Sequence, residues 1–178
     1  MLEALITSKT RLKLLLKFFL NSRTTAYLRS LEPEFDESTN AIRQELNRFE
    51  EAGLLLADKK GNKKVYHANT GHPLFPEINS LLRKYVGIDQ VIDKVVNKLG
   101  ELKEVYLVGE LAKGKDSPLI DLWFVGEAID KNYLLELVEK VEQVLERKIR
   151  YIIISTGELQ NFLKTKPAKE VLLIWSKE

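Results

Sequence analysis

The chain has 178 residues, of which 44% are hydrophobic and 30% are charged, a balance typical of a folded protein with enough apolar side chains for a core. It contains no cysteine, which excludes disulfides, thiolate zinc sites and cysteine nucleophiles and fits a reducing compartment. No apolar run approaches the length of a membrane span, and the Leu-rich segment 12–20 contains two lysines and no cleavage pattern, so we expect a cytoplasmic protein.

The net charge of +2 is unevenly distributed along the chain. Residues 1–86 contain 14 Lys and Arg against 10 Asp and Glu, a net charge of +4. Residues 87–178 contain 14 against 16, a net charge of −2. The front half is therefore the better candidate for binding a polyanion.

Two helices are predicted before residue 35. Leu and Phe recur on one face over residues 7–20, which predicts an amphipathic helix. A shorter helix is predicted over 24–31. We expect it to stop near Glu32, because Pro33 disfavours helical geometry in the residue before it.

A third helix and a β-hairpin follow. The helix is predicted over residues 38–52, with Ser38 or Asp36 as its N-cap and Gly53 just after its end. Short apolar segments on both sides of a turn at 59–62 predict the hairpin. Three helices followed by a hairpin is the order of a winged helix-turn-helix domain.

Polar side chains lie on the outer face of the third predicted helix. Ile42, Leu46 and Phe49 recur at i, i+4 and i+7 and are expected to face the core, with Glu45 on the flank. The outer face carries groups that suit base edges, and the hairpin tip adds lysines that suit the DNA backbone. We predict DNA contacts from Ser38, Thr39, Asn40, Arg43, Gln44, Asn47, Arg48, Lys59, Lys60, Asn62, Lys63 and Lys64.

The front half resembles winged helix-turn-helix repressors of the arsenical-resistance-operon type and the related multiple-antibiotic-resistance regulators. Residues 41–55 (AIRQELNRFEEAGLL) match the recognition helix running into the wing, and residues 61–66 (GNKKVY) match the wing's tip and return. The acidic segment 32–37 is longer than the usual turn of these families. The resemblance implies a transcriptional regulator that binds double-stranded DNA as a homodimer on a near-palindromic operator.

The rest of the chain is predicted to begin with helices. Apolar residues recur over 78–86, in a helix that either closes the first domain or pairs with a second subunit through Ile78, Leu81, Leu82 and Tyr85. Gly87 is a plausible domain boundary, and another helix is predicted over 88–99.

Strands and helices alternate after residue 100. Short apolar runs predict buried strands, and amphipathic spacing between them predicts a long helix over 131–147 and a short one after Ser155. The strands are predicted at 105–108, 120–125, 149–154 and 171–175. This alternation indicates a small α/β domain.

Residues 105–125 resemble the small nucleotidyltransferases of the DNA polymerase beta superfamily. In that family a strand ends in Gly-Ser and the next strand opens with Asp-x-Asp. Together with a third carboxylate on a later strand, this pair holds two magnesium ions. Gly109 and Asp121 match, but Glu110 replaces the serine and Leu119 replaces the first aspartate. The later predicted strand has no carboxylate. We therefore predict no catalytic residue, no metal site and no cofactor.

The predicted fold class is an α+β winged helix-turn-helix domain, residues 1–86, followed by a small α/β nucleotidyltransferase-like domain, residues 87–178. The favoured hypothesis is a DNA-binding transcriptional regulator whose second domain binds an effector or forms dimer contacts, without a membrane partner. A small-molecule or nucleotide effector would meet Gly109, Glu110, Lys113 and Asp121.

Two other classes of function stay open. One is an active nucleotidyltransferase, such as a toxin–antitoxin component, with a DNA-binding front domain. The other is a protein-interaction module. His67 and His72 lie five residues apart without a cysteine or a further histidine, so we interpret them as wing or loop residues rather than metal ligands.

Overall fold

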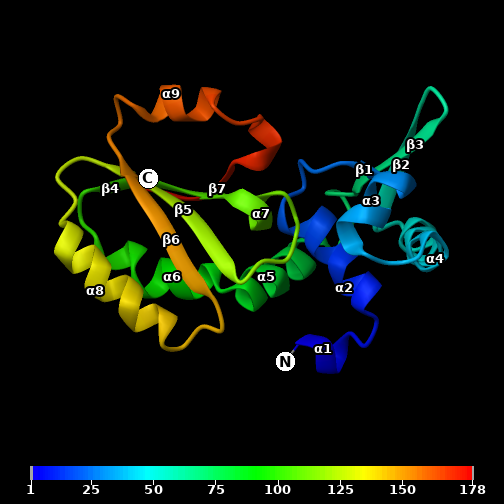
Figure 1. Ribbon diagram of the computed structural model, residues 1–178, viewed down its shortest axis with the longest axis horizontal. Helices are drawn as coiled ribbons and strands as arrows, with labels where there is room; N and C mark the ends of the chain where they lie inside the picture. Colours follow the sequence, from blue (N-terminus) through cyan, green and yellow to red (C-terminus); the bar gives the residue numbers. More distant parts are fainter. Residues whose placement is uncertain (1, 178) are drawn as a thin grey trace. The chain divides into compact units, whose positions relative to one another are not determined.

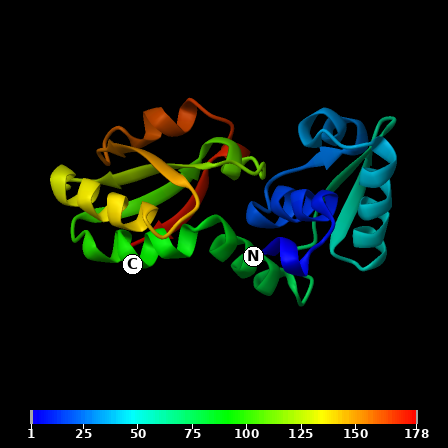
Figure 2. The same cartoon turned by 60° about the horizontal axis from the view of Figure 1, so that its bottom comes forward.

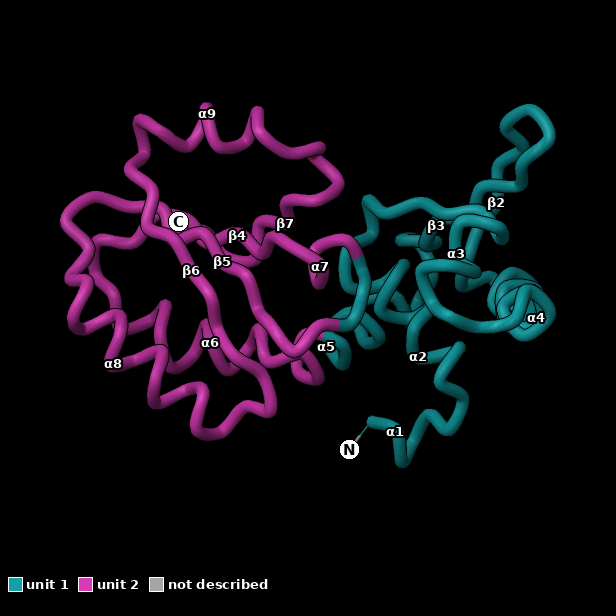
Figure 3. Tube along the Cα trace, in the orientation of Figure 1, with its two compact units in different colours: residues 1–82, 114–116 teal, residues 83–113, 117–178 magenta. Residues whose placement is uncertain are grey.

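The computed structural model describes residues 2–177 and divides into two compact units (Figure 1, Figure 3). The first unit comprises residues 1–82 and 114–116, and the second comprises residues 83–113 and 117–178. The division lies between Leu82 and Arg83, inside helix α5 (Phe75–Val86), slightly before the predicted boundary at Gly87.

The predicted helix over 7–20 is present as α2 (Lys9–Leu15), continued by a π-helical segment, η1 (Leu16–Leu20). Ser8 caps its start, because its side chain accepts a hydrogen bond of 3.1 Å from the Arg11 N–H. A short helix that was not predicted, α1 (Leu2–Leu5), precedes it. Helix α2 and η1 together contribute five of the largest fully buried side chains of the first unit, namely Leu14, Leu16, Phe18, Phe19 and Leu20.

The prediction that the second helix ends before Pro33 is wrong. Helix α3 (Leu28–Phe35) starts later than predicted, contains Pro33 and ends at Asp36, which has a left-handed backbone with φ of 51°. Leu31 and Phe35 lie one turn apart and are both buried. The free energy gained by burying these two side chains exceeds the cost of the hydrogen bond that Pro33, which has no N–H, cannot donate.

Helix α4 (Thr39–Glu51) lies where the third helix is predicted. Its N-cap is Ser38, whose side chain accepts a hydrogen bond of 3.2 Å from the Ala41 N–H. Gly53 follows the helix end with φ of +72°, a conformation that favours glycine.

The hairpin is also present and projects from the helices of the first unit (Figure 1). Strands β2 (Leu55–Lys60) and β3 (Lys63–Ala68) are antiparallel, and Gly61 and Asn62 form the two-residue turn between them. The sheet has a third strand that was not predicted. Strand β1 (Ala26–Tyr27) pairs antiparallel with β3, and the order is β1-β3-β2.

Most of the apolar stripe of helix α5 is at least partly buried by other residues of the chain. Leu82 is fully buried, Ile78 and Tyr85 are half-buried, and Leu81 is 42% exposed. The Tyr85 ring lies under the guanidinium of Arg147 at 5.3 Å. Leu81 is therefore the side chain of this stripe that is most accessible to a second subunit.

The second unit is a mixed α/β unit built on a four-stranded sheet of order β6-β5-β4-β7. Strand β4 is antiparallel to β5 and β7, whereas β5 is parallel to β6. All four predicted strands are present. Three are longer than predicted, namely β4 (Leu102–Val108), β5 (Leu119–Gly126) and β6 (Lys148–Ile154), and β7 (Leu172–Ser176) is shifted by one residue.

Helices cover both faces of this sheet. Helices α6 (Ile88–Lys94) and α8 (Lys131–Glu142) lie side by side on one face, and α9 (Leu159–Lys164) lies on the other (Figure 2). Helix α8 makes the crossover between the parallel strands β5 and β6. Helix α7 (Gly109–Ala112) connects β4 to β5. Within residues 2–177, every helix is too short or too polar to cross a bilayer.

We expect Phe35→Ala to lower the free energy of unfolding by about 3–5 kcal/mol, because a buried ring is removed and a cavity is left at the end of α3. The exposed Arg29 on the same helix is the control, and Arg29→Ala should change stability by less than about 0.5 kcal/mol. Urea unfolding of both variants measures the difference. Equal effects would mean that Phe35 does not hold the helix beyond Pro33.

Candidate functional site

A cleft of about 610 Å³ opens in the first unit between the start of α3, helix α4 and the hairpin. Its lining combines cations, amides and aromatic rings: Tyr27, Leu28, Arg29, Arg43, Asn47, Asn62, Lys63, Lys64 and Tyr66. Five of these residues belong to the predicted DNA-contact set: Arg43, Asn47, Asn62, Lys63 and Lys64. Tyr27 and Arg29 were missed, because they lie in the segment that the sequence predicted as the middle of a helix.

The cations of this cleft differ in whether an acid compensates them. Arg29, Arg43 and Lys63 form no ion pair within residues 2–177. The Lys63 ammonium lies 4.1 Å from the centre of the Tyr27 ring, a cation–π contact that orients it without neutralising it. The cleft therefore carries uncompensated positive charge.

The outer face of α4 is exposed as predicted, at Asn40, Arg43, Gln44, Asn47 and Arg48. On the hairpin, Lys59 and Lys60 are also exposed and have no ion-pair partner in the described part of the chain. Two of the predicted contact residues at the start of α4 have local structural roles. Ser38 caps the helix, and the Thr39 hydroxyl donates a hydrogen bond of 2.6 Å to Glu32.

The expectation that Glu45 lies on the flank is wrong, since it is buried with 6% of its surface exposed. Its carboxylate accepts hydrogen bonds of 2.9 and 3.1 Å from the Arg11 guanidinium of α2 and one of 2.9 Å from Arg48. The hydrogen bond with Glu45 raises the pKa of Arg11. A buried carboxylate needs such partners; Arg11 connects α4 to α2, and Arg48, on the same helix as Glu45, supplies a second cation.

Lys64 is also paired. Its ammonium lies 2.5 Å from a carboxylate oxygen of Glu50, and this hydrogen bond raises the pKa of Lys64. The pair joins the hairpin to the last turn of α4, so the two walls of the cleft are connected.

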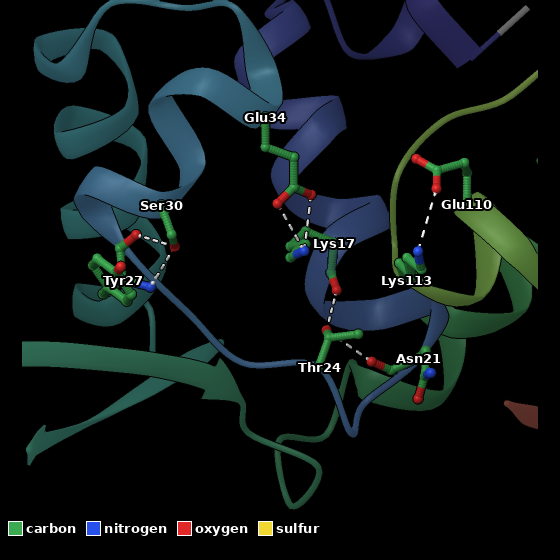
Figure 4. A network of polar contacts seen from close by, with 8 residues as sticks. All are labelled: Lys17, Asn21, Thr24, Tyr27, Ser30, Glu34, Glu110 and Lys113. Atoms are coloured by element: carbon green, nitrogen blue, oxygen red, sulfur yellow. Dashed lines mark hydrogen bonds and ion pairs between the residues drawn. The ribbon is translucent and has the colours of Figure 1, made fainter. Parts of the chain in front are cut away.

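Helix α3, whose start forms the third wall of the cleft, is held at both ends (Figure 4). The buried Lys17 of η1 donates hydrogen bonds of 2.8 and 3.0 Å to the Glu34 carboxylate on α3. The Ser30 side chain accepts a hydrogen bond of 3.1 Å from the Tyr27 N–H and donates one of 2.7 Å to the Tyr27 carbonyl. These contacts fix the position from which Tyr27 and Arg29 reach the cleft.

The second unit contains a separate pocket of about 240 Å³ on its sheet. The lining residues come from the end of β4, from β5 and β6, and from the segment after α9: Val108, Gly109, Asp121, Leu122, Trp123, Arg150, Tyr151, Ile152 and Lys166. Of the four residues predicted for an effector, Gly109 and Asp121 line the pocket. Glu110 and Lys113 do not, and they lie 3.5 Å apart as an ion pair on and beside α7 (Figure 4).

Asp121 is held by Arg150, which stands directly opposite it in the register of β5 and β6. The guanidinium Nε donates to the Asp121 carboxylate, and this contact raises the pKa of Arg150. The Asp121 side chain is 13% exposed. An arginine therefore occupies the strand position beside Asp121, on the later strand where the resemblance implies a third carboxylate.

Gly109 makes room for the Asp121 carboxylate. Its φ is +72°, and a Cβ atom added there would clash with the Asp121 carboxylate. Within residues 2–177, no three acidic or histidine side chains are grouped so that they could hold a metal ion.

No protein-family model and no curated protein matches this chain. A solved crystal structure from Sulfolobus solfataricus, described as that of a candidate nucleotidyltransferase, is similar over 56% of this chain and 86% of its own. The sequence identity is 22% and the TM-score is 0.39. A similarity at this level assigns neither a family nor an activity to the chain.

We expect Gly109→Ala to destabilise the second unit by about 1–3 kcal/mol, because the new methyl group requires a strained backbone and displaces Asp121. Gly157→Ala is the matched control, since its added Cβ would meet no atom within 4 Å. Thermal unfolding of both variants tests the expectation. It fails if the two substitutions have the same effect.

Proposed function

We propose that the protein is a DNA-binding regulator whose first unit binds duplex DNA through α4 and the hairpin, as a winged helix-turn-helix domain. The supporting observation is the cleft in which Arg29, Arg43 and Lys63 carry positive charge that no acid of the described chain neutralises. Uncompensated cations around an exposed helix suit a polyanion, whose phosphates replace the missing acidic partners.

The composition of the cleft fits duplex DNA better than a simple anion. Arg43 and Asn47 lie one helical turn apart on the exposed face of α4, and these side-chain types pair with the edges of guanine and adenine in the major groove. Lys59, Lys60 and Lys63 lie on the hairpin, where they would meet phosphates beside the groove. The same charge argues against a pure protein-interaction module.

For the second unit we propose a binding role without catalysis. Two-metal phosphoryl transfer needs several carboxylates that share the ions, and Asp121 is instead neutralised by Arg150. The nucleotidyltransferase alternative would have to hold magnesium beside an arginine.

A homodimer on a near-palindromic operator stays a prediction from the family resemblance. Leu81 on α5 is the exposed apolar residue that could contribute to such an interface. Two-fold symmetry would place the two α4 helices about one DNA turn apart.

We expect Arg43→Ala to weaken binding to a specific duplex by about 1–3 kcal/mol, because it removes an unpaired guanidinium from the exposed face of α4. Arg48→Ala should have a smaller direct effect, since Glu45 already holds that side chain. Replacing Lys59 and Lys60 together should weaken binding to all DNA sequences alike and reduce the salt dependence of that binding.

Fluorescence anisotropy with labelled duplexes selected from genomic DNA, over a range of salt concentrations, measures these effects. Lys9→Ala is the control, because Lys9 is an exposed lysine at the start of α2 that does not line the cleft. Absence of binding to any duplex at low salt would rule out the proposal.

We expect no nucleotidyl transfer from any ribonucleoside triphosphate to protein or nucleic acid, with magnesium or manganese, because one arginine-bound carboxylate cannot hold two metal ions. Incubation with labelled triphosphates, followed by electrophoresis, is the measurement. Label incorporation that Asp121→Ala abolishes would instead establish the enzyme alternative.

A further inference from the structure

The pocket on the sheet of the second unit has an excess of positive charge. Arg150 and Lys166 line it together with one acidic residue, Asp121. Arg150 uses its Nε for Asp121, and its other guanidinium nitrogens have no hydrogen-bond acceptor among residues 2–177. Lys166 is half-buried and has no hydrogen bond or ion pair in the same part of the chain.

The Lys166 ammonium has no acidic partner in the described part of the chain, so its positive charge at the pocket is available to an anionic ligand. The Asp121 carboxylate does not compensate for Lys166, since Arg150 already holds it. The polar side of the pocket is therefore complementary to an anion. It also repels a divalent cation, because two positive side chains face a single neutralised carboxylate.

The other side of the pocket is apolar. Val108 and Trp123 form part of the small core between the sheet and α9, and Ile152 is 41% exposed at its edge. The Trp123 ring is fixed by edge contacts with Phe162 at 5.6 Å and by the Tyr106 ring at 6.5 Å. A rigid aromatic wall beside two cations suits an amphipathic ligand.

We propose that this pocket binds a small organic anion without a metal ion. The carboxylate or phosphate group of the ligand lies between Arg150 and Lys166, and its apolar body packs against Trp123 and Ile152. The cavity of about 240 Å³ has room for a small organic molecule. This inference names a ligand class for the binding role proposed above for the second unit. The site shares no residue with the DNA cleft, so a negative result here would leave the DNA-binding proposal untouched.

Isothermal titration calorimetry of the full chain, in the presence of a chelator, tests the site. The probes are phenyl phosphate, benzoate, inorganic phosphate and the neutral benzyl alcohol. We expect both aromatic anions to bind, phenyl phosphate to bind more tightly than inorganic phosphate, and benzyl alcohol not to bind. The relative affinities of phenyl phosphate and benzoate show whether the site prefers a phosphate or a carboxylate group.

Three variants connect the binding to the pocket. Lys166→Gln should weaken phenyl phosphate binding about tenfold or more, because a charge-assisted hydrogen bond is lost. Ile152→Ala should weaken phenyl phosphate but leave inorganic phosphate unchanged. Lys164→Gln on α9 is the control, since Lys164 is exposed and does not line the pocket.

Unfolding of each variant without ligand verifies that it is folded before binding is compared. The proposal is overturned if no probe binds, if folded Lys166→Gln binds phenyl phosphate as tightly as the unmodified protein, or if Lys164→Gln loses affinity to the same extent. A requirement for magnesium would also overturn it.

Discussion

The buried carboxylate of Glu45 joins α2 to α4, and the proposed DNA-binding surface depends on this connection. Arg11 approaches Glu45 from one helix and Arg48 from the other, so three charged groups share one network. One helical turn after Glu45, the Phe49 ring of α4 packs edge-on against Phe19 of η1, with the ring centres 6.4 Å apart. Apolar burial brings the helices together, and the ion pairs fix the rotation of α4, because a buried carboxylate is stable only where its partners can reach it. Arg43 and Asn47 face outward as a consequence.

The cations on and around α4 and its cleft differ in their roles. Arg11, Arg48 and Lys64 contact acids and position secondary structure. Arg29, Arg43 and Lys63 have no acidic partner in the described chain and border an open cleft. Composition alone, with a net charge of +4 over residues 1–86, cannot separate cations that are paired with acids from cations that are free to meet a polyanion.

In the second unit, one ion pair changes what the sheet can bind. The pairing of Asp121 with Arg150 occupies the carboxylate that the nucleotidyltransferase resemblance would assign to a metal. Gly109 permits this arrangement, because its missing side chain leaves room for the carboxylate. With Lys166 also lining the pocket, the function we propose for it is the binding of an anion rather than phosphoryl transfer.

The sequence by itself determined the elements whose signals are local. The spacing of Ile42, Leu46 and Phe49 and the turn signal at 59–62 predicted α4 and the hairpin, and short apolar runs predicted all four strands of the second sheet. The tertiary structure decided what depends on distant residues. Helix α3 continues through Pro33 because Phe35 is buried. Glu45 leaves the surface because Arg11, 34 residues away, meets it, and Asp121 is neutralised by Arg150, 29 residues away. Periodicity and capping act within a few residues, whereas burial and charge pairing are set by which chain segments pack together, so no local pattern contains them.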